Sequence, residues 1–234
     1  MNVLVACEES QAVCIAFRNR GHRAFSCDIQ DCSGGHPEWH INADVLPLID
    51  GDCTFTTADG TECEQQGQWD LIIAHPPCTY MSKAGARWMY PTAGNIDLDR
   101  LNLALAAKDF FFKFINAKCD RIAVENPRPL KIVGLPKPTQ VIQPYQFGHP
   151  YSKETCLWLK GLSPLIPTDI LTEYKPYLPS NITGYRKGQK WSRGVAHNAK
   201  KASKTFKGIA EAMAEQWSRS FYQSPQCYSL FSSI

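Results

Sequence analysis

The hydrophobic positions at the start of the chain form short apolar runs separated by one stretch with helical spacing. Residues 3–6 (VLVA) are an uninterrupted apolar run, typical of a strand that is buried on both faces. Residues 10–19 repeat apolar side chains at helical spacing, and residues 23–27 form a second apolar run that ends at Asp28. A strand, a helix and a strand in this order predict a parallel sheet and an α/β fold.

The rest of the chain continues this alternation and contains no internal repeat. Residues 101–117 have the pattern of a long helix, with Leu105, Phe112 and Ile115 among its apolar positions. An Asp-Gly pair predicts a hairpin insertion within residues 50–68. The other expected elements of this single domain, residues 1–234, are strands at 70–74, 121–124 and 155–159, a short element at 42–49, loops at 29–41 and 161–185, a helix at 205–217 and a weakly anchored tail at 218–234.

Composition and the lack of targeting patterns indicate the cellular compartment of the protein. The 234 residues are 44% hydrophobic, which is ordinary for a globular domain, and a formal net charge of +3 is too small to indicate a partner by itself. The sequence has no signal-peptide pattern and no apolar run of about 18 residues. We therefore expect a cytoplasmic protein with no membrane partner, in which thiols stay reduced.

The ten cysteines are scattered and contain no CxxC pair, so we expect no metal site. Cys53 and Cys63 flank the turn of the expected hairpin, and we predict that they face each other as free thiols. The alternative metal-ligand set that remains open is Cys27, Cys32, His36 and His40.

Chemically reactive residues follow four of the expected strands. The four segments are Cys7-Glu8-Glu9-Ser10, Asp28, His75-Pro76-Pro77-Cys78 and Glu125-Asn126. In open α/β sheets, ligands bind beyond the carboxyl ends of the strands. This concentration predicts a site at one edge of the sheet.

Cys78 is the candidate nucleophile. Two prolines hold it rigidly at a strand end, where polar or positive neighbours would favour the reactive thiolate. Because Pro-Pro-Cys is a short motif, a buried structural cysteine after a turn is the alternative.

Glu125 is the candidate acid. A partly desolvated carboxyl group can have a raised pKa and exchange a proton near neutral pH. By itself Asn126-Pro127 also simply begins a turn. Glu125 and Cys78 together indicate attack on a pyrimidine, because addition at C6 needs a nucleophile, and an acid at N3 lets the ring accept the electrons.

Asp28 ends the second expected strand, where an acidic residue suits two ribose hydroxyl groups. Asp44 is a weaker candidate of the same kind, for an adenine amino group. Both are equally compatible with plain loop carboxylates.

The order Pro77-Cys78 and then Glu125-Asn126, after a strand–helix–strand unit, resembles the DNA cytosine-C5 methyltransferases. The small, phage-type members without a large target-recognition domain are the most similar. The resemblance runs in patches from Val3 to about Trp217 and is best at residues 70–82 and 121–127. Residues 147–155 (FGHPYSKET) stand where the family has a motif with two arginines, and residues 203–217 are similar to its last motif.

The resemblance implies a Rossmann-like class I methyltransferase domain that uses S-adenosyl-L-methionine, or a derivative of it, to methylate C5 of cytosine in DNA. The base would be flipped out of the duplex. The implied catalytic residues are Cys78, Glu125 and Lys153. The implied cofactor contacts are Cys7, Glu8, Ser10, Asp28, Ile29, Asp44, His75, Pro76 and Thr205. The implied substrate contacts are Pro77, Asn126, Ser82, Arg87, Lys187, Lys190 and Trp191.

The sequence departs from the family at three places. The glycine-rich first loop is replaced by residues 7–11 (CEESQ), and Pro127 stands where valine is usual. Tyr151, Lys153 and Thr155 replace a glutamine and two arginines, so base recognition and the substrate are expected to differ.

Two segments combine basic and aromatic residues and are candidates for nucleic-acid contact. The irregular segment 161–200 has no acidic residue near its end and carries Tyr185, Arg186, Lys187, Lys190, Trp191, Arg193, Lys200 and, just beyond, Lys201, Lys204 and Lys207. Residues 83–90 (KAGARWMY) would close over the base as a mobile loop, or else pack in the core. Because no large recognition domain is present, we predict short or relaxed sequence specificity.

Three alternatives remain open from the sequence. The same fold would act on RNA or on a free cytosine nucleotide, given the arginines that are missing around Lys153. A non-enzymatic nucleic-acid-binding protein would explain the missing glycines near Glu8. A transferred group other than plain methyl would suit the charges of Glu8, Glu9 and Lys153.

Overall fold

The computed structural model describes residues 1–92, 94–177 and 203–222. Its strands are β1 (Asn2–Ala6), β2 (Arg23–Asp28), β3 (His40–Asn42), β4 (Cys53–Thr56), β5 (Glu62–Gln65), β6 (Leu71–Ala74), β7 (Ile122–Asn126), β8 (Gln140–Ile142), β9 (Tyr151–Ser152), β10 (Thr155–Lys160) and β11 (Lys175–Pro176). Its α-helices are α1 (Ala12–Arg18), α2 (Ala86–Met89), α3 (Leu98–Ile115) and α5 (Lys207–Tyr222). Short 3-10 turns lie at Pro37–Trp39, Leu46–Leu48, Lys83–Gly85, Lys131–Val133 and Pro144–Gln146.

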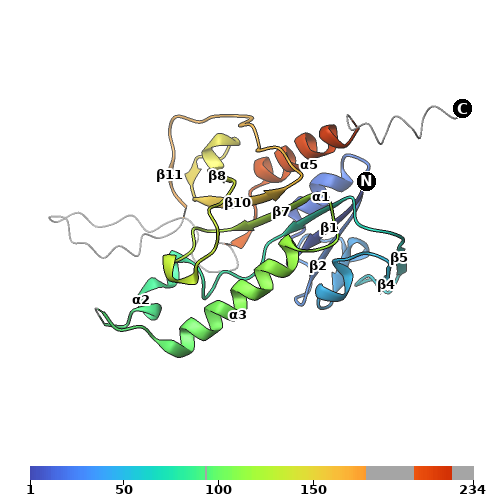
Figure 1. The fold of residues 1–234 in the computed structure, drawn as a ribbon. Helices are drawn as coiled ribbons and strands as arrows, with labels where there is room; N and C mark the ends of the chain where they lie inside the picture. The colour runs from blue at the N-terminus through green and yellow to red at the C-terminus, as the bar shows by residue number, and fades with distance from the viewer. Residues whose placement is uncertain (93, 178–202, 223–234) are drawn as a thin grey trace, which may run out of the picture.

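Seven strands form the central sheet in the order β3-β2-β1-β6-β7-β10-β8 (Figure 1). All neighbours pair in parallel except β10, which is antiparallel to both β7 and β8. The chain starts at β1, winds outward through β2 and β3, and returns to add β6 and β7 on the other side of β1. This is the Rossmann-like α/β fold that the sequence predicts, and its strand order reverses between β1 and β6, where such sheets bind ligands.

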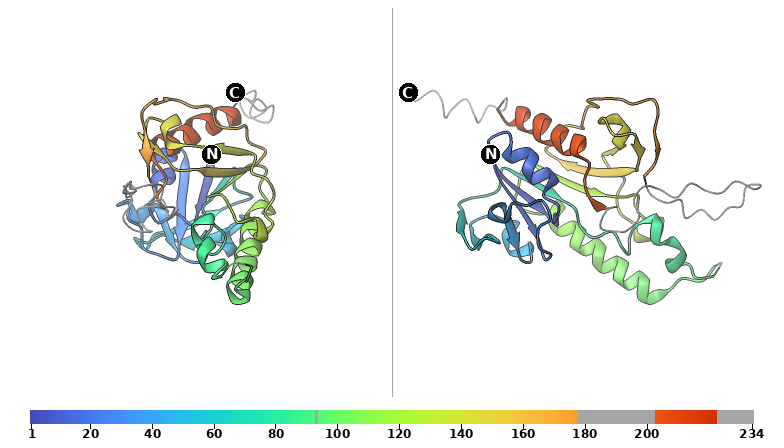
Figure 2. Two further views of the ribbon diagram at one scale, coloured as in Figure 1. Left: turned by 90° about the vertical axis from the view of Figure 1, so that its left-hand side faces the viewer. Right: turned by 180° about the vertical axis from the view of Figure 1, so that it is seen from behind.

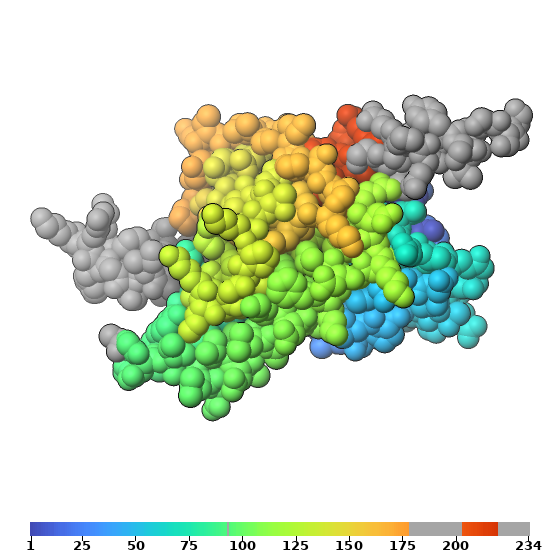
Figure 3. Space-filling model, in the orientation of Figure 1, coloured from blue at the N-terminus to red at the C-terminus, as the bar shows by residue number. Residues whose placement is uncertain are grey.

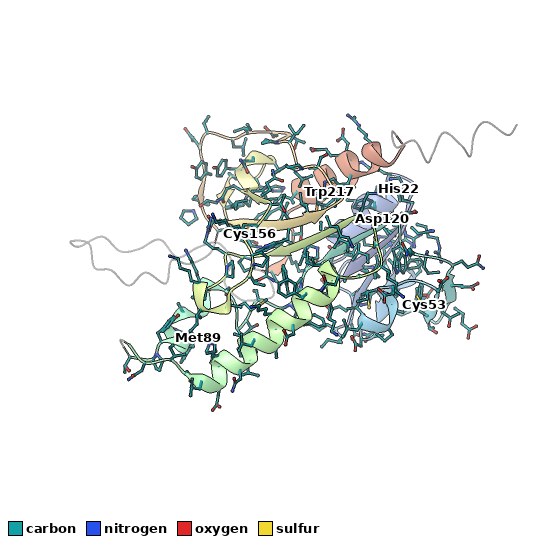
Figure 4. The ribbon with its side chains drawn as sticks, viewed as in Figure 1. His22, Cys53, Met89, Asp120, Cys156 and Trp217 are labelled. Carbon is teal, nitrogen blue, oxygen red and sulfur yellow. The ribbon has the colours of Figure 1, made fainter. Side chains whose placement is uncertain are left out.

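Helices cover both faces of this sheet, because successive strand residues point to opposite sides. Leu4 and Ile72 belong to the core beneath α3, whereas Val3 and Ile73 belong to the core beneath α1 and α5. Figure 2 shows these three layers from two further directions, and Figure 4 shows Trp217 of α5 on the second face. In the space-filling view, α3 and the segment that follows it (green to yellow) cover the front face (Figure 3).

Helix α3 is the predicted long helix, but it begins earlier and faces the sheet with other side chains. Asp97 caps it by accepting a hydrogen bond from the backbone N–H of Arg100 (2.8 Å), so the helix begins at Leu98. Ala104 and Phe111 are fully buried, whereas Leu105 is 39% exposed. Leu105 is exposed because neighbouring helix positions differ by about 100° and the buried stripe runs one residue earlier.

Strands β3 and β8 were not predicted, because they have three residues each and are too short to show a period of two. The hairpin of β4 and β5 is present, but Cys53 lies opposite Gln65 and Cys63 lies opposite Phe55. The N–H of Thr57 bonds to the carbonyl of Thr61, and this loop closure moves the two cysteines out of register. The predicted facing pair was therefore wrong.

The C-terminal helix α5 continues beyond its predicted end to Tyr222. Ser218 is buried and its hydroxyl donates to the carbonyl of Ala214, so the predicted weak anchoring was wrong at this residue. The remainder of the predicted tail, residues 223–234, lies outside the described residues. Neither α3, α5 nor any shorter helix in the described ranges combines the length and apolarity that a membrane crossing needs.

Candidate active site

Cys78 lies four residues after the end of β6, in a turn of fixed geometry. The backbone N–H of His75 donates to the carbonyl of Ala6 (2.9 Å), which extends the β1–β6 pairing to the sheet edge. Pro76 and Pro77 then restrict the backbone, and the Cys78 carbonyl accepts hydrogen bonds from Met81 and Ser82. The Cys78 side chain is half-buried, so its sulfur has a defined position without being sealed off.

The resting state of Cys78 is the thiol. Burial is the largest cause that raises the pKa of Cys78, the charge of Glu125 adds to it, and the charge of Lys153 opposes both. The sequence predicts a thiolate favoured by its neighbours, and this is wrong for the structure without a substrate, because one carboxylate and desolvation outweigh one ammonium group.

Glu125 projects from β7 directly beside His75. Ala74 and Val124 are paired in register, so the next residue of each strand meets at the sheet edge. Nδ1 of His75 and Oε2 of Glu125 are 3.1 Å apart, and their side chains are only 11% and 13% exposed. Burial alone would raise the pKa of Glu125, but the hydrogen bond and charge of His75, with Lys153, lower it. The raised pKa that a desolvated strand end suggests is therefore wrong, since a cationic partner is present.

The loops that follow Cys78 and Glu125 are tied to each other. Asn126 is buried and its amide Nδ2 donates to the carbonyl of Pro76 (2.8 Å). The N–H of Lys83 donates to the carbonyl of Arg128 (3.1 Å), and the N–H of Leu130 donates to that of Met81 (2.7 Å). These three bonds fix the separation of the candidate nucleophile and the candidate acid.

Lys153 reaches the same place from the other side. It stands between β9 and β10, and its backbone N–H donates to the side-chain oxygen of Gln143 (2.9 Å). Its ammonium group lies 5.9 Å from the centre of the Phe206 ring and acts electrostatically on Cys78, His75 and Glu125. Cys156, labelled in Figure 4, lies opposite Asn126 in the sheet and marks the strand that carries Lys153 to the site.

Glu8 occupies the end of β1 in a different way. Its carboxylate is buried and accepts the backbone N–H groups of Val13 (2.7 Å) and Cys14 (3.2 Å), so it caps the first turn of α1. Burial, the largest cause, raises the pKa of Glu8 against the lowering effect of these bonds and of His75. The position of the side chain does not support the direct cofactor contact that the resemblance implies for Glu8.

The turn that replaces the family's glycine-rich loop has its own geometry. Cys7 and Gln11 adopt positive φ angles of 57° and 58°, a region that non-glycine residues rarely occupy. The Gln11 side chain exchanges hydrogen bonds with the backbone of His36 (2.8 and 3.1 Å), and the N–H of Ser33 donates to the Glu9 carbonyl (2.8 Å). The loop after β2 is thereby bonded onto the loop after β1, beside the half-buried Ser10.

The end of β2 combines carboxylates with an exposed apolar side chain. Asp28 accepts the N–H of Gln30 (2.9 Å) and Asp44 accepts that of Leu46 (3.0 Å), each through one oxygen. Ile29, the next residue after Asp28, is 78% exposed. Carboxylate oxygens next to a bare apolar surface suit the ribose and the flat base of an adenosine group.

The remaining candidates are distributed unevenly. Thr205 is half-buried just before α5, Pro76 and Ser82 are buried, and Pro77 is exposed beside Cys78. The guanidinium of Arg87 lies 4.6 Å from the ring centre of Trp88 on α2. Lys187, Lys190 and Trp191, with the basic residues from Arg186 to Lys201, lie outside the described residues.

The segment 83–90 is folded rather than an irregular loop. A 3-10 turn and α2 occupy it, and Met89 is fully buried. Figure 4 labels Met89 on α2. Trp88 is 56% exposed and Tyr90 is 40% exposed. One residue of the three thus packs in the core, and two remain on the surface.

The alternative metal site does not form. No cluster of three or more metal-binding side chains occurs within residues 1–92, 94–177 and 203–222. The ring of His36 stacks on Trp39 at 3.8 Å, and both ring nitrogens of His40 are within 2.9 Å of other partners, Ser26 and Gln30. The side chains have therefore found partners other than a metal ion.

Comparisons with known proteins add a weak likeness. The sequence matches no protein-family profile and no curated protein. A crystal structure of a DNMT2 mutant from Spodoptera frugiperda aligns with 76% of this chain at 15% identity and a TM-score of 0.34. The present chain spans 55% of the length of that protein chain.

Proposed function

We propose that this chain is an S-adenosylmethionine-dependent methyltransferase that modifies C5 of cytosine in DNA. The observation that carries the proposal is the placement of Cys78 and Glu125 at the ends of the adjacent strands β6 and β7, in loops joined by three hydrogen bonds. A nucleophile and an acid held at a constant separation are what addition to a pyrimidine ring requires.

The residues of the site then have distinct roles. Cys78 loses its thiol proton to water, and its sulfur forms a bond to C6 of the base. The electron pair of the C5–C6 double bond moves into the ring as N3 takes a proton that Glu125 delivers. This step leaves C5 nucleophilic. When bound, S-adenosylmethionine supplies an electrophilic methyl group to such a carbon. After C5 loses its proton to water, the bond between sulfur and C6 breaks and Cys78 is restored.

The carboxyl end of the sheet suits the cofactor at the switch point between β1 and β6. Asp28 would hold the ribose hydroxyl groups, and Ile29 would cover the adenine ring, which explains why this apolar side chain is 78% exposed in the protein alone. Asp44 would face the adenine amino group. Cys7 and Ser10 would contact the cofactor from the turn with positive φ, while Glu8 holds α1 in place behind them.

DNA is proposed as the substrate because exposed basic and aromatic side chains follow Cys78 closely along the chain. Lys83, Arg87 and Trp88 are all exposed within ten residues of Cys78. Lysine and arginine neutralise phosphates, and an exposed indole stacks on bases. RNA and a free cytosine nucleotide would meet the same residues, so the experiment compares all three.

The test is transfer of tritium from methyl-labelled S-adenosylmethionine to duplex DNA, to RNA and to dCMP. We expect label in the cytosine of DNA with the wild type and with Cys63→Ala, a control on the remote hairpin, and none above background with Cys78→Ala. If label appears only in RNA or only in dCMP, that molecule rather than DNA is the substrate. Label that survives in Cys78→Ala, or no label on any substrate, would contradict the proposal.

A further inference from the structure

His75 is placed more rigidly than a surface histidine. Its backbone N–H is bonded to the carbonyl of Ala6 and Pro76 follows it, so the backbone that carries the ring is fixed at the sheet edge. Nδ1 lies 3.1 Å from the carboxylate of Glu125. Nε2 is shielded from solvent and has no hydrogen-bond partner within the described part of the chain. Within the described residues, Nδ1 thus bonds to Glu125, and Nε2 has no acceptor that would compete for the proton of the ring.

The charges around the ring favour a proton on this pair. Glu8 from the β1–α1 turn and Glu125 from β7 contribute negative charge, Lys153 from the β9–β10 loop contributes positive charge, and Cys78 is the remaining titratable neighbour. Burial, the largest single cause, would lower the pKa of His75, but the hydrogen bond and charge of Glu125, supported by Glu8, raise it. In the resting site the shared proton therefore lies on the imidazole, and Glu125 is a carboxylate.

A carboxylate cannot protonate N3 of a base unless another group supplies the proton. We propose that His75 is the positioning residue that stores this proton and returns it through Glu125, an inference that rests on the proposed cytosine chemistry. The arrangement of the ring explains why a titratable residue, rather than a small one, stands directly before the two prolines.

The proton inventory of the step balances. As sulfur bonds to C6, the proton moves from Nδ1 of His75 to Oε2 of Glu125, and a proton passes from the Glu125 carboxyl group to N3. The imidazole becomes neutral, the carboxylate is regenerated and the base gains one proton. When the bond between sulfur and C6 breaks, N3 returns its proton to Glu125 and the imidazolium forms again. No oxidant, reductant or further reactant is needed.

The first experiment needs no substrate. Histidine-labelled protein is titrated by NMR as the wild type and as Glu125→Gln, with His75→Asn used to assign the signal among the six histidines. We expect the pKa of His75 to lie above the ordinary 6.5 in the wild type and below it in Glu125→Gln, because only burial then remains dominant. A value at or below 6.5 in the wild type, or no change in Glu125→Gln, would overturn the proposal.

The second experiment is the pH profile of single-turnover methyl transfer for the wild type, His75→Asn and the control His22→Asn. Asparagine keeps an N–H group for Glu125 but cannot store a proton. The rate of His75→Asn should therefore begin to fall with rising pH at least one pH unit below the point where the wild-type rate falls. His22 is a buried histidine that lies near Trp217 (Figure 4). It precedes the start of β2, whereas Cys78 follows the end of the parallel strand β6, so its variant should keep the wild-type profile. A lower rate with an unmoved alkaline limb would mean that His75 is only structural.

The two experiments separate this inference from the proposed function. If the NMR titration shows the pair but the wild type transfers no methyl group, the cytosine chemistry fails and the role in base protonation falls with it, while the pair stands. If the wild type methylates DNA and the titration shows no dependence on Glu125, only the inference about His75 fails.

Discussion

Glu8 and Glu125 are two buried glutamates at the same edge of one sheet, and their partners make them different. Glu8 accepts two backbone N–H groups at the start of α1, whereas Glu125 meets the imidazole of His75. A backbone N–H cannot release its proton, so Glu8 fastens the helix and acts on the neighbouring His75 only through its charge. An imidazole can release one, so Glu125 can take part in proton transfer. Burial and residue type alone therefore do not identify a catalytic carboxyl group.

The largest expected effect is the loss of methyl-transfer rate on substitution of Glu125, which tests this contrast. Glu125→Gln keeps the shape of the side chain but cannot carry the proton to N3, so single-turnover methyl transfer should fall by about 10³-fold. At pH 9, where the ion pair no longer contributes, its urea unfolding midpoint should stay close to that of the wild type, because the amide still accepts the hydrogen bond from His75. A variant that keeps a rate within tenfold of the wild type would remove Glu125 from the chemistry.

Glu8→Ala should show the opposite behaviour. The variant leaves the N–H groups of Val13 and Cys14 buried without acceptors, which should lower the free energy of unfolding by about 2–3 kcal/mol. The measurement is urea denaturation followed by circular dichroism. Glu8→Gln, which retains one acceptor oxygen, serves as the graded control and should lose less. Equal stability of Glu8→Ala and the wild type would mean that Glu8 does not hold α1.

The sequence was sufficient for the parallel sheet and for the strand ends that carry Cys78 and Glu125. Their positions follow from apolar runs of four and three residues, 71–74 and 122–124, which Pro76 and Asn126 follow two residues later. The pairing of His75 with Glu125 was not predicted, although both residues directly follow paired positions of neighbouring strands. Aligning the ends of β6 and β7 would have suggested it.

Other features depend on contacts that the local pattern does not contain. Capping by Glu8 needs the angle at which α1 leaves β1, and this follows from the positive φ of Cys7 and Gln11. The short strands β3 and β8 form because longer neighbours offer open edges, not because of their own three residues. The pKa directions of Cys78 and Glu125 depend on the charges of His75 after β6, Glu125 on β7 and Lys153 after β9, which meet only in the folded protein.

The pH dependence of stability should show a smaller effect, which comes from the pair of His75 and Glu125. The raised pKa of His75 makes its contribution to stability complete below about pH 6.5, and the contribution is lost as the pH rises through the folded value. The lowered pKa of Glu125 makes its contribution present above about pH 4.5, and it is lost as the pH falls further. The stability gap between the wild type and His75→Asn should therefore be widest between pH 4.5 and 6.5.

The measurement is the urea midpoint of both proteins at pH 5.5 and pH 9. Glu8 titrates in both proteins, so its effect largely cancels in the difference. A gap that is equal at the two pH values, or larger at pH 9, would show that His75 and Glu125 are not an ion pair.

The smallest expected effect concerns the exposed pair that joins the Glu125 loop to the Lys153 loop. The guanidinium of Arg128 bonds to the carboxylate of Glu154 (2.6 Å), but both side chains are 41% exposed to water. Water screens such a pair, and the backbone bond from Lys83 to Arg128 does not need the side chain. Arg128→Ala should lower the melting temperature by about 2 °C or less and leave the rate at saturating DNA within about twofold. A much larger loss of rate, matched by Glu154→Gln, would mean that the ion pair rather than the buried backbone bonds sets the distance between Lys153 and Glu125.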